Sequence, residues 1–190
     1  MKLILASASP RRAEILRNFG VDFEIVPSNA PEIVDENTPC DKISEELARL
    51  KARDIFEKHP DRTVLGADTT VILGNTVLGK PKNDGDAFNM LTLLSGKTHH
   101  VCTGVCIISD GREISFTEKT GVTFFELTPE EIRDYIATGE PADKAGAYGI
   151  QGLGGLFVKE IHGDYLTVVG LPGARCVRIL RQLTTETDSE

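Results

Sequence analysis

Residues 63–73 read "TVLGADTTVIL", and this stretch decides the fold class of the chain. Its apolar and β-branched side chains predict a strand that is largely buried. The residues that follow, "LGNTVL", are typical of a hairpin turn leading into a second short strand. Asp68 interrupts the apolar run with a carboxylate, so the strand that organises the fold also carries a candidate functional group.

Helices and further strands are interspersed on both sides of this strand, and their order predicts an α/β or α+β fold with a mixed sheet. The turn "SDGR" between two long β-branched runs predicts a hairpin, and "TPEE" predicts a capped helix start. We expect strands at 2–6 and 22–27, helices at 10–19, 40–58, 84–95 and 128–139, a final hairpin from "LFVKEI" and "YLTVVG", and a C-terminal helix opened by Pro172.

The length of 190 residues suits one substantial domain, which we expect over residues 1–183 with a polar tail at 184–190. The net charge of −8 excludes a general attraction for nucleic acid or for an anionic membrane. Any bound anion therefore needs a local cluster of cations. No apolar run approaches the ~20 residues of a membrane span, and the N-terminus does not resemble a signal peptide, so we expect a cytoplasmic location.

The cysteines and histidines favour no metal site. None of the four cysteines belongs to a C-x-x-C pair, so free thiols are favoured over a disulfide framework or a zinc site. The four histidines lack metal-ligand spacings such as H-E-x-x-H.

Residues 9–12, "SPRR", place two cations where a helix prefers anions. Proline is favoured at the first helical position, so Arg11 and Arg12 fall in the first turn. That end of the helix dipole is positive and normally attracts acidic side chains. The arrangement predicts that an anion binds there.

Two lysines and Asp68 each allow a structural and a functional interpretation. Lys51 lies at the edge of the apolar stripe of the 40–58 helix, either extending its ammonium to solvent or directing it into a site. A buried carboxylate such as Asp68 needs hydroxyl or backbone partners, or a cation, and beside a metal it could hold the ion or orient a water. Lys80 precedes a proline, which favours extended backbone, and could equally be an ordinary loop lysine.

The segment 146–155 contains five glycines and carries Gln151 in its middle. Such a loop can bring backbone N–H groups close to a ligand, although it could also be a flexible surface loop. The Gln151 amide presents a donor and an acceptor side by side, as a base edge does. With the four cations and Asp68, the pattern suits a polyphosphate, a divalent metal and one base.

The motifs "SASPRR", "GADTTVILGNTVLGKP", "LSGKTHHVCTGV" and "DKAGAYGIQGLGG" resemble those of the Maf family of nucleoside triphosphate pyrophosphatases, in the same order and spacing. The resemblance runs from residue 3 to about residue 180. It implies an α/β fold of two lobes with a mixed sheet around a central cleft, similar to inosine triphosphate pyrophosphatases. It also implies hydrolysis of dTTP and UTP to the monophosphate and pyrophosphate with a divalent cation, Mg²⁺ or Mn²⁺. The form "AGAYGIQG" resembles the dTTP/UTP branch more than the 7-methyl-GTP branch.

The same resemblance assigns residue roles, which we state as expectations. Asp68 is the expected proton acceptor or metal ligand, and Arg11, Thr69 and Gln151 are linked to substrate choice. Phosphate-side roles fall to Arg12, Lys51 and Lys80, and a second metal-ligand role falls to Glu32, with Glu36 as a nearby rival because the loop varies in length. The anion expected beside Arg11 and Arg12 is then a nucleoside triphosphate, with the helix dipole adding to their charge.

Two other functions remain open at this stage. The family resembles proteins linked to septum formation, so the chain could be a nucleotide-binding regulator of cell division with little turnover. A nucleic-acid binder is disfavoured by the net charge. The family resemblance also implies a homodimer, with neither nucleic acid nor membrane as partner.

Overall fold

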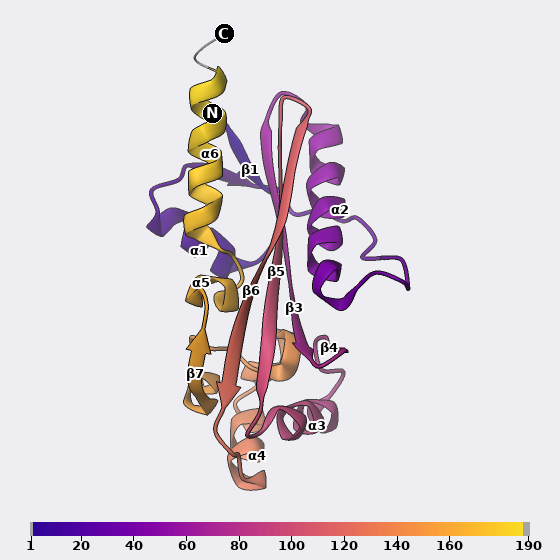
Figure 1. Ribbon diagram of the computed structural model, residues 1–190, viewed down its shortest axis with the longest axis vertical. Coiled ribbons are helices and arrows are strands. Elements are labelled where there is room, and N and C mark those ends of the chain that lie inside the picture. The colour runs from indigo at the N-terminus through magenta and orange to yellow at the C-terminus, as the bar shows by residue number, and fades with distance from the viewer. Residues whose placement is uncertain (1, 188–190) are drawn as a thin grey trace. The chain divides into compact units, whose positions relative to one another are not determined.

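The computed structural model describes residues 2–187 as helices packed on a mixed β-sheet (Figure 1). The strand order is β2-β1-β3-β5-β6-β7, with β4 beside β3. Strand β1 pairs in parallel with β2 and β3, whereas β4 and β7 pair antiparallel with β3 and β6, so the predicted mixed sheet is confirmed. The strands are β1 (Leu3–Leu5), β2 (Phe23–Ile25), β3 (Thr63–Leu73), β4 (Thr76–Leu78), β5 (Thr98–Ser109), β6 (Arg112–Phe124) and β7 (Val158–His162). The α-helices are α1 (Pro10–Asn18), α2 (Ile43–Lys58), α3 (Asp84–Leu94), α4 (Pro129–Ala137), α5 (Tyr165–Val169) and α6 (Gly173–Thr187).

The chain divides into two compact units. The first unit contains the chain up to Asp68, Thr103–Glu118 and the segment from Gly170 onward. The second unit contains Thr69–Cys102 and Lys119–Val169. Strands β3, β5 and β6 pass from one unit into the other, and β3 and β5 contribute side chains to a hydrophobic core in each unit.

In the first unit, helix α2 covers one face of the strands and helices α1 and α6 cover the other (Figure 1). Alternation along each strand explains this, because successive side chains point to opposite faces. Ile4 and Val64 pack with Ala48, Ala52 and other side chains in the core beneath α2. Helix α2 is preceded by a 3₁₀ turn at Cys40–Lys42, so the predicted 40–58 helix begins in a tighter turn.

Helix α2 approaches the sheet closely at Gly66. A Cβ atom on Gly66 would lie 2.4 Å from the Ala48 carbonyl oxygen and 2.8 Å from the Ala52 backbone nitrogen. Only a residue without a side chain allows this contact, because real Cβ atoms are not found so close to backbone. Glycine at this position therefore sets the distance between helix and strand, and with it the reach of the α2 side chains.

The start of α2 is fixed to β6 by the buried carboxylate of Glu45. Its oxygens accept hydrogen bonds from Arg49 Nη2, Lys42 Nζ, Ser115 Oγ and Thr117 Oγ1 at 2.9–3.0 Å. Burial alone would raise the pKa of Glu45, but these four donors outweigh burial and lower the pKa to about 2.

We expect Glu45→Gln to lower the free energy of unfolding at pH 7 by about 3 kcal/mol. The folded pKa lies below the unfolded value of 4.5, so the stabilisation is complete above pH 4.5 and is lost as the pH falls towards 2. Urea unfolding from pH 7 to pH 3 should therefore show the gap between wild type and variant closing below pH 4.5. The control is Glu46→Gln on the same helix, whose side chain is 46% exposed. A pH-independent gap for Glu45→Gln would contradict the assignment.

The second unit has its own core of aliphatic and aromatic side chains. Phe124 contacts His99 and Tyr148 edge to face, with ring centroids 4.8 Å apart in both pairs. The two-residue turn between β5 and β6 has positive φ at Asp110 and Gly111, which confirms the hairpin predicted from "SDGR". The predicted capping box at the start of α4 is also present, with Thr128 and Glu131 bonded reciprocally.

The predicted final hairpin is wrong. "LFVKEI" contributes strand β7, but "YLTVV" forms helix α5 and pairs with no strand. The Asp164 carboxylate accepts hydrogen bonds from the Thr167 backbone nitrogen and hydroxyl, both at 2.7 Å, which caps the first turn of this helix. The local cap therefore outweighs the β-branched composition that suggested a strand.

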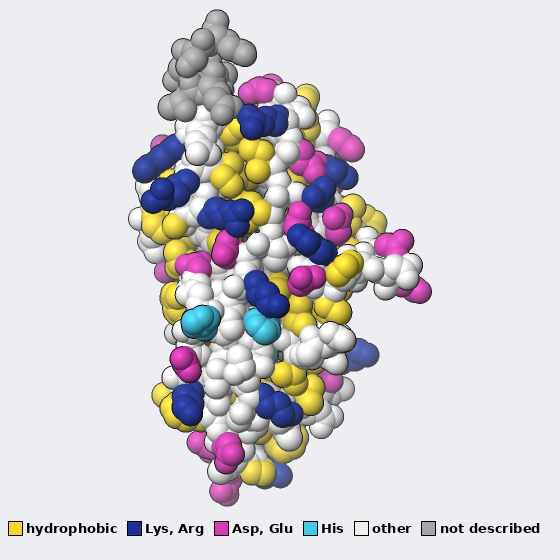
Figure 2. All heavy atoms as spheres, in the orientation of Figure 1, with side chains coloured by type: hydrophobic (Ala, Val, Ile, Leu, Met, Phe, Trp, Pro, Cys, Tyr) yellow, Lys and Arg dark blue, Asp and Glu magenta, His cyan; other side chains and the backbone are white. Residues whose placement is uncertain are grey.

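The C-terminal helix extends further than expected. Helix α6 continues to Thr187, so the backbone of 184–187 is helical, and the rest of the expected polar tail lies outside the described residues. Of the four cysteines, Cys40 is half-buried, and Cys102, Cys106 and Cys176 are buried. Across residues 2–187, no helix is both long enough and apolar enough to cross a membrane. Basic and acidic side chains are interspersed on the face drawn in Figure 2.

Candidate active site

Asp68 lies on the face of β3 that α2 covers. Val64, Gly66 and Asp68 share this face because strand side chains alternate with a period of two residues. Lys51 lies on α2 between Ala48 and Ala52, which contact Gly66. The close approach at Gly66 therefore delivers the Lys51 ammonium to the Asp68 carboxylate, and the two atoms Nζ and Oδ1 are 2.6 Å apart.

Lys51 joins two carboxylates. Its Nζ lies 2.6 Å from Asp68 Oδ1 and 2.7 Å from Glu32 Oε1. The side chains of Lys51 and Asp68 are each 15% exposed, whereas that of Glu32 is 61% exposed. The ammonium of Lys51 contacts carboxylates and does not extend to solvent, and its functional role stays a prediction. The ion pair with Lys51 also places Glu32 in this cluster. Glu32 and its rival Glu36 are both exposed, so exposure does not distinguish them.

Arg12 is fixed beside the same cluster by two hydrogen bonds. Its Nε donates to the Gly170 carbonyl oxygen and its Nη1 donates to Ser7 Oγ, both at 2.9 Å. Burial lowers the pKa of Arg12, Asp68 and Glu32 raise it by attraction, and Arg11 lowers it by repulsion. These charges act on one another within the first unit. The predicted helix start is confirmed as well, with Pro10 in the first turn of α1 and no acidic side chain there.

The second unit holds the other three predicted residues. Thr69 is half-buried and begins the part of β3 that belongs to this unit, while Lys80 and Gln151 are exposed. The Gly146 backbone nitrogen donates to the Gly79 carbonyl oxygen at 3.0 Å. This bond ties the glycine-rich loop that carries Gln151 to the turn that carries Lys80.

Three backbone N–H groups of the glycine-rich loop donate to side chains of the protein. The Gly149 nitrogen donates to Tyr135 Oη, and the nitrogens of Leu153 and Gly154 donate to the Glu140 carboxylate, at 2.9–3.2 Å. The sequence interpretation, that such groups of the loop approach a ligand, is therefore corrected for these three. The sequence analysis did not find Tyr135 and Glu140 as partners, because both lie outside the motifs and nothing in the nearby sequence indicates that they bind this loop.

Ser7 and Gly170 were also missed as partners of Arg12. Ser7 belongs to "SASPRR", and its spacing of five residues from Arg12 was the available signal. Gly170 lies 158 positions along the chain from Arg12, so only the fold could reveal that contact.

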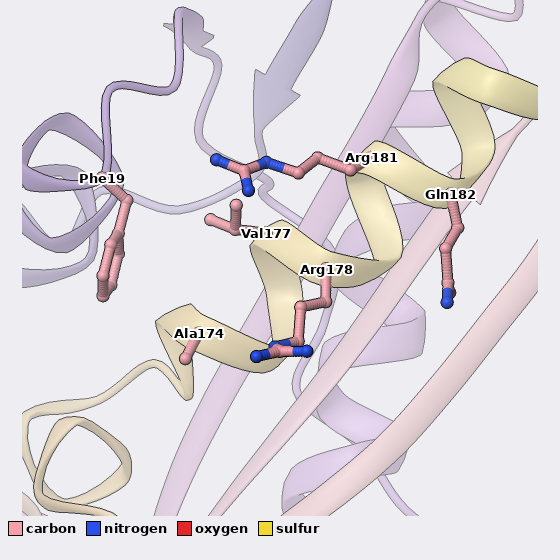
Figure 3. A pocket seen from close by; sticks show the side chains of 6 residues that line it. All are labelled: Phe19, Ala174, Val177, Arg178, Arg181 and Gln182. Carbon is pink, nitrogen blue, oxygen red and sulfur yellow. The ribbon is translucent and has the colours of Figure 1, made fainter.

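A separate hollow of about 500 Å³ lies in the first unit (Figure 3). Phe19 lines it from the end of α1, and Ala174, Val177, Arg178, Arg181 and Gln182 line it from α6. None of the predicted site residues lines this hollow. It is therefore distinct from the cluster around Asp68.

A family model and the curated relatives point to one family. A family model described as "Maf-like protein" matches residues 2–183. A dTTP/UTP pyrophosphatase of Bacillus cereus is 52% identical over 185 residues, covering 97% of each chain. One of Bacillus mycoides is also 52% identical with the same coverage. Among solved structures, the Staphylococcus aureus Ham1 protein matches with a TM-score of 0.47 and 15% identity, covering 65% of this chain and 72% of that chain.

Proposed function

Since the chain belongs to the Maf-like protein family, we propose that it is a nucleoside triphosphate pyrophosphatase that hydrolyses dTTP and UTP to the monophosphate and pyrophosphate. The observation that carries the proposal is the cluster in which Lys51 joins Asp68 and Glu32, with Arg12 fixed nearby. The test is a panel of nucleoside triphosphates assayed for released pyrophosphate with Mg²⁺ or Mn²⁺. Release from dTTP and UTP supports the proposal, whereas substrate binding without release would favour the alternative of a nucleotide-binding regulator.

The proposed reaction needs a water, a base and stabilisation of phosphate charge. Water attacks the α-phosphorus, the bond to the bridging oxygen breaks, and pyrophosphate leaves. Asp68 either accepts the proton of the water or holds the metal. Arg12 is suited to bind phosphate because its guanidinium is already oriented by Ser7 and Gly170.

Asp68 and Glu32 fit a divalent cation. Both direct a carboxylate oxygen at one point, which the Lys51 ammonium occupies here at 2.6–2.7 Å. Hard cations such as Mg²⁺ bind through one or two carboxylates together with substrate phosphates. We therefore propose these two residues as ligands, and the ion would stabilise negative charge on the phosphates. Lys51 would then be released to contact phosphate.

The remaining roles are proposals that rest on the family resemblance. We assign Lys80 to the phosphates, and Arg11, Thr69 and Gln151 to substrate choice. The homodimer and the cytoplasmic location likewise stay predictions, and sizing chromatography tests the first of them.

We expect Lys51→Ala and Lys80→Ala each to lower kcat/KM for UTP, dTTP and CTP by a similar factor. Each ammonium would contact phosphate and not base, so selectivity among bases should stay unchanged. The loss of one charge-assisted hydrogen bond of about 1.5–3 kcal/mol corresponds to about 10- to 150-fold. Steady-state kinetics with the three nucleotides under one metal measure this.

Lys51 has a matched control on α2, and Lys80 has one in the same segment between β4 and α3. Lys58→Ala removes an exposed ammonium from the end of α2, and Lys82→Ala removes one two positions from Lys80. Both controls should keep wild-type kcat/KM. If either test variant altered the ratio between bases while sparing the overall rate, its assignment to phosphate would be wrong.

A further inference from the structure

The loop around Gln151 is held by two side chains that no motif of the site includes. Glu140 accepts from the Leu153 nitrogen through Oε2 at 2.9 Å and from the Gly154 nitrogen through Oε1 at 3.2 Å. Tyr135 Oη donates to Glu140 Oε1 at 2.9 Å and accepts from the Gly149 nitrogen at 3.0 Å. The bonds therefore fall on both sides of Gln151.

These two residues are themselves firmly placed. Tyr135 lies on α4, is 4% exposed and packs edge to face on Phe157 with centroids 4.9 Å apart. Glu140 begins the 3₁₀ turn Glu140–Asp143, and its backbone carbonyl accepts from Lys144 Nζ at 2.7 Å. Burial alone would raise the pKa of Glu140. Hydrogen bonds from Leu153, Gly154 and Tyr135 outweigh burial and leave the pKa below its usual value, so the carboxylate is ionised at neutral pH.

Glycines stand where Glu140 and Tyr135 approach the loop. A Cβ on Gly152 would lie 2.4 Å from Glu140 Oε2, and one on Gly154 would lie 2.7 Å from Tyr135 Oη. A side chain at either position would displace the carboxylate or the phenol from the loop. The glycines are therefore needed for close approach of Glu140 and Tyr135, while Gln151 between them stays exposed.

We propose that Glu140, supported by Tyr135, is a positioning residue that holds Gln151 for base recognition and so sets the preference for UTP over CTP. The inference rests on the proposed function, because it takes Gln151 as a base-contacting residue. A fixed backbone restricts where the Gln151 amide can lie before substrate binds, and a flexible loop would have to be ordered at each binding event. Glu140 acts through Gln151 and needs no contact with the nucleotide.

The main test is Glu140→Gln, which keeps the size of the side chain but replaces one acceptor oxygen by an amide donor. That amide faces a backbone N–H group, so at least one of the two loop bonds is lost. We expect the UTP-to-CTP ratio of kcat/KM to fall by about fivefold, the effect of one lost hydrogen bond. The fall should arise mainly from a higher KM for UTP. Tyr135→Phe should lower the ratio in the same direction, and it remains informative if Glu140→Gln does not fold.

The control is Asp143→Asn in the same 3₁₀ turn, whose carboxylate bonds Lys144 and should leave the ratio unchanged. The double variant Glu140→Gln/Gln151→Ala separates direct from indirect action. In the Gln151→Ala background, Glu140→Gln should change the ratio no further, because Glu140 acts through that side chain.

Three outcomes would overturn the inference, and they are distinguishable. If wild type releases no pyrophosphate from UTP or dTTP, the proposed function fails and the inference fails with it. If wild type is active but Glu140→Gln lowers kcat/KM for all nucleotides by one factor, Glu140 only stabilises the fold. If the ratio still shifts in the Gln151→Ala background, Glu140 acts by another route.

Discussion

Asp68→Asn is expected to lower kcat for UTP and dTTP by about 100-fold or more, the scale of lost acid–base assistance. The asparagine carbonyl oxygen can still accept the hydrogen bond from Lys51 Nζ, which lies 2.6 Å from Oδ1 in the wild type. The swap is nearly isosteric, so the contact between α2 and β3 through Gly66 should persist. What disappears is the negative charge that could bind a metal or accept a proton from water. Pyrophosphate release under saturating substrate measures the effect.

Asp61→Asn is the matched control, because this exposed carboxylate lies just before β3 in the same unit. It should keep wild-type kcat. Thermal unfolding of both variants checks that the fold is intact. If folded Asp68→Asn retained wild-type kcat, Asp68 would be a structural residue and the proposed reaction would lose its base and its metal ligand.

The elements that sequence predicted well are those with local signals. The strand at 63–73, the "SDGR" hairpin and the capped start of α4 follow from periodicity, turn residues and a capping box. Helix α5 was missed because its residues favour a strand, while the decisive hydrogen bonds from Thr167 to Asp164 span only three positions. Reading Asp164 as a helix cap would have identified it.

The contacts of the site likewise differ in whether a local sequence signal predicts them. Periodicity placed Lys51 at the edge of the α2 stripe, but it could not tell that Gly66 lets α2 approach β3 closely enough for an ion pair with Asp68. The pairing of Lys51 with Glu32 depends on the course of an irregular loop, which carries no periodic signal. The family resemblance indicated the site residues, and the structure shows which of their atoms are in contact.

The Gln151 side chain cannot by itself choose between uracil and cytosine. A glutamine amide can flip its oxygen and nitrogen, so it could bind the edge of uracil or that of cytosine. The loop N–H groups of Gly149, Leu153 and Gly154 do not orient the amide directly, because they donate to Tyr135 and Glu140. A substitution that removes the ambiguity is therefore the most direct test of base recognition.

Gln151→Glu is expected to lower the UTP-to-CTP ratio of kcat/KM by about 5- to 150-fold, because a good amide–base contact is worth about 1–3 kcal/mol. An ionised carboxylate only accepts hydrogen bonds, so it should repel the carbonyl of uracil or thymine and tolerate the amino group of cytosine. The side chain is exposed, so the substitution buries no charge in the fold. The measurement is kcat/KM for UTP, dTTP and CTP under one metal. Asn89→Asp is the control, since it adds the same charge at an exposed position of α3 in the same unit and should leave the ratio unchanged.

An unchanged UTP-to-CTP ratio in Gln151→Glu would remove Gln151 from base recognition. An equal fall of the ratio in Gln151→Glu and Asn89→Asp would make the effect one of net charge.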